Sequence, residues 1–83
     1  MLLIVLDTNI LVAAISRHSP FHWVWESFIQ GKYELGITTD ILDEYAEIIE
    51  RYFSVKDAEY TLTQIVLQKN VVYTIRYFEW NII

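Results

Sequence analysis

Two carboxylates, Asp7 and Glu44, have the surroundings in this sequence that most favour chemistry. Asp7 directly follows the apolar run Leu2 to Leu6, and a charge next to a buried strand is costly unless it is paired or bound to a metal. A carboxylate in this position can also cap the helix that follows. Asp7 is therefore predicted to bind a metal or to cap a helix, and the two roles can coexist.

Glu44 is selected by helical geometry from the acids between Asp40 and Glu50. At roughly 100° per residue, one apolar stripe faces the sheet, and it contains Ile41, Leu42, Tyr45, Ile48, Ile49 and Tyr52. Glu44 lies just beyond the edge of this stripe, one turn into the helix, from where its carboxylate can lean towards Asp7. The alternative for Glu44 is an ordinary solvated charge. That alternative is preferred for the other acids of the helix, which are Asp40, Asp43, Glu47 and Glu50.

Two carboxylates at one end of a sheet suit a hard cation. Mg²⁺ prefers oxygen ligands, keeps several waters, and often takes only one or two protein carboxylates together with substrate phosphates. Such an ion can orient a water for attack and stabilise charge on a phosphodiester. A paired-carboxylate acid–base site is a weaker alternative, because nothing in the sequence indicates a sugar-binding groove.

The elements that would position these carboxylates alternate between strands and helices. Strands are predicted over Leu2–Leu6, Lys32–Ile37 and Val71–Ile75, and no structure is assigned to Arg76–Ile83. Helices are predicted over Ile10–Ile15 with Thr8 or Asn9 as its cap, Pro20–Gly31, Thr39 to about Phe53, and from Ser54 or Asp57 to Lys69. This order predicts an α/β fold of three layers, α/β/α, with right-handed crossovers and a parallel sheet. Ligands of such sheets bind beyond the carboxyl ends of the strands, where Asp7 and the segment from Thr38 to Glu44 are expected.

Two segments resemble the PIN-domain family, and in particular its toxin branch, which is similar to VapC-type toxins of toxin–antitoxin pairs. The first is Ile4-Val-Leu-Asp-Thr-Asn-Ile-Leu-Val12, a hydrophobic strand followed by Asp-Thr-Asn and a helix. The second runs from Tyr33 to Arg51 and resembles the second strand and acidic helix of the family. The resemblance covers Leu3 to about Glu79.

The resemblance implies roles for individual residues. Asp7 matches the first metal-binding aspartate and Glu44 the glutamate of the helix, while Asn9 and Thr8 match positions that support the site. The implied activity is Mg²⁺- or Mn²⁺-dependent endoribonuclease cleavage of RNA. The implied partners are an antitoxin protein and a second copy of the chain, in a homo-oligomer.

One departure from the family concerns the end of the chain. The family completes its metal site with further aspartates in a later Asp-rich stretch, and this sequence ends at Ile83 before such a stretch. Residues 1–83 are therefore expected to form a single, incomplete PIN-like domain whose C-terminal part is missing. The alternative function is that of a catalytically inactive, truncated module that acts through dimerisation or antitoxin binding.

Composition limits the remaining classes. Hydrophobic residues make up 54% of the 83 residues, which predicts an uncovered apolar surface or a partner. The net charge of −5 argues against binding nucleic acid by bulk electrostatics, but not against a nuclease whose carboxylates hold cations. The sequence has no cysteine, no run long enough to cross a membrane and no signal-peptide pattern, so we expect a cytoplasmic protein with no membrane partner.

Three further sets of residues each have two possible roles. His18 and His22 are interpreted as loop histidines rather than a metal pair, because Pro20 lies between them. Arg17 could touch an RNA phosphate near the active end, but an ordinary surface arginine is preferred. Trp23, Trp25 and Phe28 could stack on bases, but at helical spacing Trp25 and Phe28 are preferred as core or dimer contacts.

Overall fold

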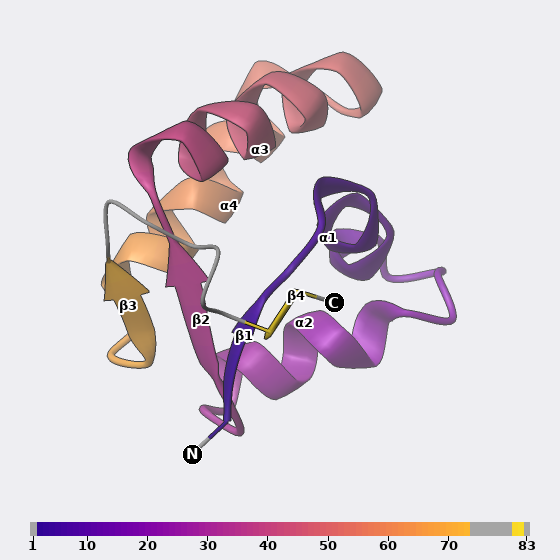
Figure 1. The fold of residues 1–83 in the computed structure, drawn as a ribbon. Coiled ribbons are helices and arrows are strands. Elements are labelled where there is room, and N and C mark those ends of the chain that lie inside the picture. Colours follow the sequence, from indigo (N-terminus) through magenta and orange to yellow (C-terminus); the bar gives the residue numbers. More distant parts are fainter. Residues whose placement is uncertain (1, 74–80, 83) are drawn as a thin grey trace.

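A computed structural model describes residues 2–73, 81 and 82 of the chain (Figure 1). In chain order its elements are β1 (Leu3–Val5), α1 (Thr8–Ile15), α2 (His22–Ile29), β2 (Glu34–Ile37), α3 (Thr39–Tyr52), α4 (Val55–Leu67), β3 (Val71–Tyr73) and β4 (Asn81–Ile82). The predicted alternation of strands and helices is confirmed. The predicted third strand extends to Ile75, but residues 74 and 75 lie outside the described part, and the short strand β4 was not predicted.

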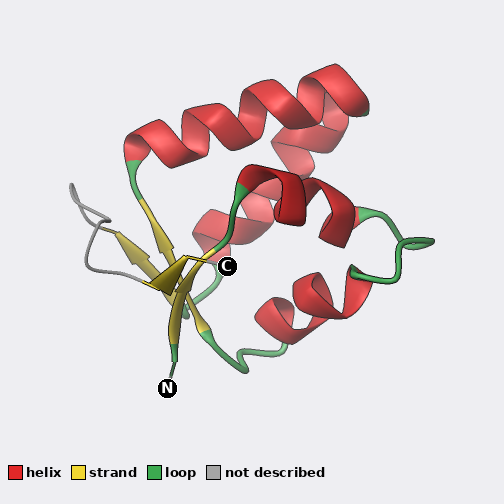
Figure 2. Ribbon diagram, turned by 45° about the vertical axis from the view of Figure 1, so that its right-hand side comes forward, coloured by secondary structure: helices red, strands yellow, loops and turns green. Residues whose placement is uncertain are grey.

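The strands form one parallel sheet with the order β3-β2-β1-β4. The chain moves in the same direction across the sheet from β1 to β2 and from β2 to β3, so right-handed crossovers place both helical pairs on the same face. Figure 2 shows α1 to α4 together on one side of the strands. The α/β class with a parallel sheet is confirmed. Of the three predicted layers, the described residues show the sheet and one helical layer, and a second helical layer stays a prediction.

The core lies between this helical layer and the sheet. Leu35 and Ile37 of β2 are completely buried, and each helix contributes side chains that pack against the same core. The completely buried side chains of the helices include Leu11, Phe28, Tyr45, Ile49 and Ile65. Burial of each such side chain is worth roughly 1.5–3 kcal/mol relative to exposure. The core therefore holds α1 and α3, the two helices that follow β1 and β2, in fixed positions.

The predicted apolar stripe of α3 is confirmed along most of its length. Ile41, Tyr45 and Ile49 are buried, and Leu42 packs against the core from a partly exposed position. Tyr52 was wrongly included, since it is 66% exposed. It lies in the last turn of a 14-residue helix, which projects beyond the strands (Figure 2).

Side-chain caps fix where the helices begin. The carboxylate of Asp7 accepts a hydrogen bond from the Asn9 amide at 3.0 Å, so α1 begins at Thr8, and the prediction that Thr8 or Asn9 is the cap was wrong. The physical reason is that Asp7 has an extended backbone and a short side chain that reaches the first free amides of the helix. Thr38 caps α3 through the Ile41 amide, and Ser54 caps α4, as one of the two predicted alternatives.

The helix α2 begins later than predicted, at His22 rather than Pro20. Its end is as predicted: Gly31 has a φ of +76° just beyond the last turn, a conformation that glycine adopts without steric cost. The strand that follows starts at Glu34, two residues after the predicted Lys32.

No helix in the described part of the chain is both long enough and apolar enough to cross a membrane. The longest, α3, has 14 residues, and a helical span needs about 20. The apolar excess of the sequence is visible instead at the surface, where Trp23, Tyr60 and Leu67 are each more than 60% exposed.

Candidate carboxylate site

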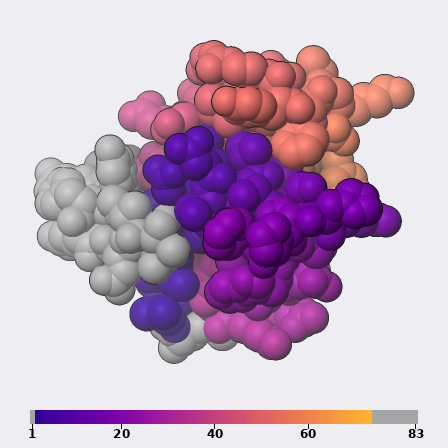
Figure 3. All heavy atoms as spheres, turned by 90° about the vertical axis from the view of Figure 1, so that its right-hand side faces the viewer, coloured from indigo at the N-terminus to yellow at the C-terminus, as the bar shows by residue number. Residues whose placement is uncertain are grey.

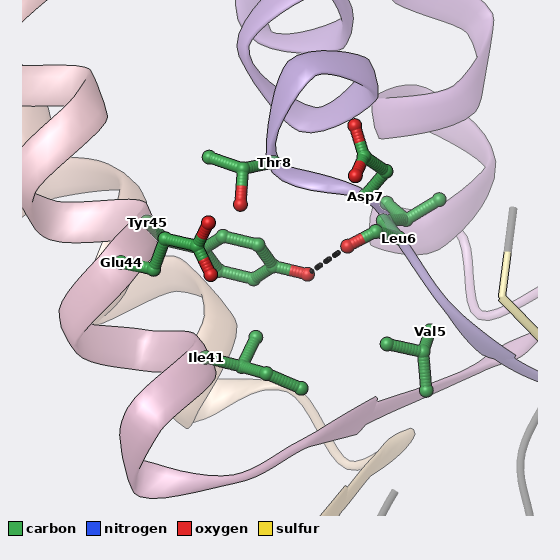
Figure 4. Close-up of a pocket in the computed structure, with 7 residues that line it drawn as sticks. All are labelled: Val5, Leu6, Asp7, Thr8, Ile41, Glu44 and Tyr45. Carbon is green, nitrogen blue, oxygen red and sulfur yellow. Dashed lines mark hydrogen bonds between the residues drawn. The ribbon is translucent and has the colours of Figure 1, made fainter. Parts of the chain in front are cut away.

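Asp7 and Glu44 line one cavity at the carboxyl end of the sheet. Asp7 stands between β1 and α1, and Glu44 stands in the second turn of α3, which begins directly after β2. The cavity has a volume of about 190 Å³ and is lined by Val5, Leu6, Asp7, Thr8, Ile41, Glu44 and Tyr45 (Figure 4). The structure thus brings together the two carboxylates that the sequence selected.

The carboxylate of Asp7 already has a structural role. Its Oδ2 atom accepts the Asn9 amide, and the side chain remains exposed. Of the two roles predicted for Asp7, the helix cap is confirmed. Its role as a metal ligand stays a prediction. The exposed carboxylate of Glu44 extends from α3 towards the same cavity (Figure 4).

Thr8 and Asn9, the two residues predicted to support the site, contact it in different ways. Thr8 lines the cavity and is partly buried, with its side chain on the side of Glu44 (Figure 4). Asn9 is exposed and is not among the lining residues. Its contribution is the main-chain amide that holds the carboxylate of Asp7. Asn9 therefore supports the site through its backbone, and Thr8 through its position at the cavity wall.

Tyr45 is a site residue that sequence reasoning placed only in the core. Its ring is completely buried, and its hydroxyl donates a hydrogen bond of 2.6 Å to the carbonyl of Leu6, the residue before Asp7. Burial raises the pKa of Tyr45, and electrostatic repulsion from Tyr33, Asp7 and Glu44 raises it further. A tyrosine in a buried stripe needs a partner for its hydroxyl, and this requirement, next to Glu44, was the available signal.

The oxygen atoms around the cavity fit a hard cation. In the described residues no group of three or more His, Cys, Asp or Glu side chains is arranged to hold a metal. Two carboxylates and the Thr8 hydroxyl are nevertheless the kind of ligands that Mg²⁺ and Mn²⁺ accept. A cation held there would keep positions for water and for a substrate phosphate.

The other polar candidates lie elsewhere. His22 is not a loop residue as predicted: it opens α2, and its Nδ1 atom is 2.7 Å from the carbonyl of Ala14, where it joins α2 to α1. His18 is exposed. Arg17 is also exposed and lines a different cavity, between α1, α2 and α4, together with Trp25 and Tyr60. Phe28 is buried in the core, which confirms the preferred interpretation for that residue.

Comparisons with known proteins leave the family open. No model of a known protein family matches this chain, and no curated protein matches it either. The resemblance to PIN domains therefore rests on the residues quoted above.

Proposed function

We propose that this chain is a PIN-like, metal-dependent endoribonuclease of the toxin–antitoxin type. The observation that carries the proposal is the single cavity shared by Asp7 and Glu44 at the carboxyl ends of parallel strands. Ligand sites of parallel sheets occur at this end. The two residues come from positions 37 apart in the chain, so their meeting is a property of the fold rather than of a local run of charge.

The residues of the chain would act mainly by holding charge in place. Asp7 and Glu44 would hold Mg²⁺ or Mn²⁺ between α1 and α3, and Thr8 would limit the width of the cavity. The cation, when bound, supplies the positive charge that an RNA phosphate needs and a polarised water for its hydrolysis. Without it, the two carboxylates and the net charge of −5 repel a phosphodiester.

The test is cleavage of a mixed-sequence single-stranded RNA by the purified chain in Mn²⁺. Asp7→Asn and Glu44→Gln should each remove the cleavage. Asp43→Asn and Glu50→Gln are matched controls, because they remove the same charges from exposed positions of α3 that do not line the cavity. Equal loss in variants and controls would assign the effect to net charge, and activity that survives Asp7→Asn would overturn the proposal.

A second candidate function is a non-catalytic module that acts through dimerisation or antitoxin binding. It is favoured by a groove between α1, α2 and α4, formed by two neighbouring cavities of about 240 and 310 Å³ that share Ile15, Arg17, Trp25 and Tyr60. Figure 3 shows the surface of α1 next to those of α3 and α4, with the surface of α2 on its other side. Aromatic and arginine side chains of this kind are enriched where proteins bind one another.

The two candidate functions predict different results for RNA cleavage and for self-association. If the chain is a module, wild type does not cleave RNA in Mn²⁺, and it self-associates in analytical ultracentrifugation. Tyr60→Arg should then weaken the association. Leu67→Arg, on the same helix and also highly exposed, is the control because Leu67 lies outside the groove. A monomer that cleaves RNA would exclude the module as the main function.

A further inference from the structure

Tyr45 connects the two segments that carry the carboxylates. Its hydroxyl bonds to the carbonyl of Leu6, one residue before Asp7, and its backbone directly follows that of Glu44. The donor and acceptor are 39 residues apart in the chain. This hydrogen bond therefore ties α3 to the end of β1 within one residue of both carboxylates (Figure 4).

This hydrogen bond holds the backbone at Leu6, which lies between β1 and α1 and belongs to neither element. Leu6 lies after the last residue of β1 and before the first residue of α1, so its carbonyl is outside the sheet ladder. A hydrogen bond in a buried, poorly solvated place is stronger than one in water, and loss of the donor would leave the carbonyl unsatisfied. The hydroxyl of Tyr45 thus restricts the direction in which the chain leaves β1 towards Asp7.

The arrangement also concentrates negative charge near one buried hydroxyl. Asp7 and Glu44 both line the cavity that Tyr45 also lines. Two like charges on separate elements tend to move those elements apart when no cation lies between them. The bond from Tyr45 opposes that movement at the point where it would start.

We infer that Tyr45 is a positioning residue that holds Asp7 and Glu44 at a fixed separation before a cation binds. The inference deepens the proposed function and rests on it for the identity of the ligand. Tyr45 lines the cavity, but its hydroxyl is engaged with the carbonyl of Leu6, so we do not infer a ligand role for it. It acts through the carbonyl of Leu6 on one carboxylate and through the backbone of α3 on the other.

The structure offers a matched control at Tyr33. Tyr33 is also buried, and its hydroxyl also donates to a main-chain carbonyl, that of Val24, at 2.9 Å. It is absent from the lining of the carboxylate cavity and lies before β2, at the opposite end of that strand. Tyr33→Phe and Tyr45→Phe each remove one buried hydroxyl and keep the ring, so they separate a general loss of stability from a loss of positioning.

The experiment compares these two variants with wild type by two measurements. Mn²⁺ affinity is measured by isothermal titration calorimetry, and backbone mobility is measured by ¹⁵N relaxation of the Asp7, Thr8 and Glu44 amides in metal-free protein. Tyr45→Phe should weaken Mn²⁺ binding about tenfold, at the lower end of the 10- to 100-fold typical of outer-shell partners. It should also raise the mobility of these amides, whereas Tyr33→Phe should change the affinity less than about twofold and leave their mobility unchanged.

The outcomes distinguish this inference from the proposed function. If wild type binds no Mn²⁺ but Tyr45→Phe alone mobilises the amides, the positioning role stands and the metal proposal fails. If wild type binds Mn²⁺ and Tyr45→Phe binds it equally well, or if both variants mobilise the amides alike, Tyr45 is a structural core residue and the inference is overturned.

Discussion

The two ends of the sheet satisfy their buried polar groups in the same way but differ in the charges around them. At the base, before β2 and β3, Tyr33 donates to the carbonyl of Val24, and the Asn70 side-chain amide donates to the carbonyls of Phe28 and Tyr33 at 3.0 and 2.7 Å. At the carboxyl end, Tyr45 donates to the carbonyl of Leu6. Each end is thus held by a side chain that reaches across the fold to a main-chain carbonyl.

The difference is that two carboxylates share a cavity at the carboxyl end, whereas the one carboxylate that lines the cavity at the base, that of Glu34, shares it with Lys69. Asp7 and Glu44 line the cavity at the carboxyl end, and within the described residues neither forms an ion pair. Two carboxylates that line one cavity without a cation repel each other. The base of the sheet is therefore organised for stability, and the carboxyl end keeps a charge arrangement that stability alone does not require. Substitutions at the two ends should have opposite effects on activity and on folding.

The largest expected effect is at the carboxyl end. Glu44→Gln should reduce Mn²⁺-dependent RNA cleavage by at least about 100-fold, because even outer-shell partners of a metal site are worth roughly 10- to 100-fold. The free energy of unfolding, measured in urea, should stay the same or rise slightly, because one of two like charges is removed. A large loss of stability in this variant would remove the contrast between the two ends.

The next effect is at the base, where Asn70→Ala should lower the free energy of unfolding by about 2–4 kcal/mol. The variant loses two hydrogen bonds and leaves two carbonyls with one partner fewer, at about 1–3 kcal/mol for each such group when buried. Urea unfolding measures the loss, and calorimetry should show an unchanged Mn²⁺ affinity. Glutamine at position 68, a partly buried neighbour, provides the control variant Gln68→Ala, for which no such loss is expected.

Burial of Tyr33 predicts an effect of pH on the stability of the fold. Burial raises the pKa of Tyr33 from 10.0 to about 12, so the folded chain keeps a proton that the unfolded chain loses in this range. Stability should therefore be constant with respect to this group below about pH 10 and fall as the pH rises towards 12. Tyr33→Phe should make the fall between pH 10.0 and about 12 shallower in urea titrations. A slope equal to that of wild type would show that the hydroxyl is not protected by the fold.

The smallest effect is expected at Gly31, also near the base. An added Cβ would meet no atom within 4 Å, so Gly31→Ala should cost only the backbone strain of a φ of +76°. That strain is about 1 kcal/mol, and Gly31→Asn should cost less, because asparagine tolerates this conformation better. Urea unfolding of the two variants measures the difference, and neither should alter RNA cleavage. An equal cost for alanine and asparagine would point to a clash rather than to the backbone.

Most of the fold could be predicted because its signals are local. The apolar run before Asp7, the caps at Thr38 and Ser54 and the glycine after α2 each mark a boundary within a few residues. An error occurred where three neighbouring residues could each cap the same helix. Asp7, Thr8 and Asn9 can all cap a helix, and the backbone at Asp7 decides between them. The strand β4 could not be predicted, because two residues carry no periodicity.

The carboxylates of the site could be predicted from the sequence, but the hydrogen bond between Tyr45 and Leu6 could not. A helical wheel selects Glu44, since the wheel depends only on spacing along one helix. The bond from Tyr45 to Leu6 joins residues 39 apart, and no pattern in the sequence specifies which carbonyl a buried hydroxyl will meet. The metal and the RNA substrate stay predictions, and they rest on the resemblance and on the cavity.

The strand order has a consequence for synthesis on the ribosome. β1 is an interior strand whose two neighbours are β2 and β4, and its pairing with β4 joins Ile4 to Asn81 and Val5 to Ile82. Translation proceeds from the N-terminus at about 5–20 residues per second, so the side of β1 that will meet β4 stays open for roughly 4–15 seconds. An open strand edge of this kind can pair with other nascent chains. β1, the strand that precedes Asp7, is thus made long before the strand that encloses its second side.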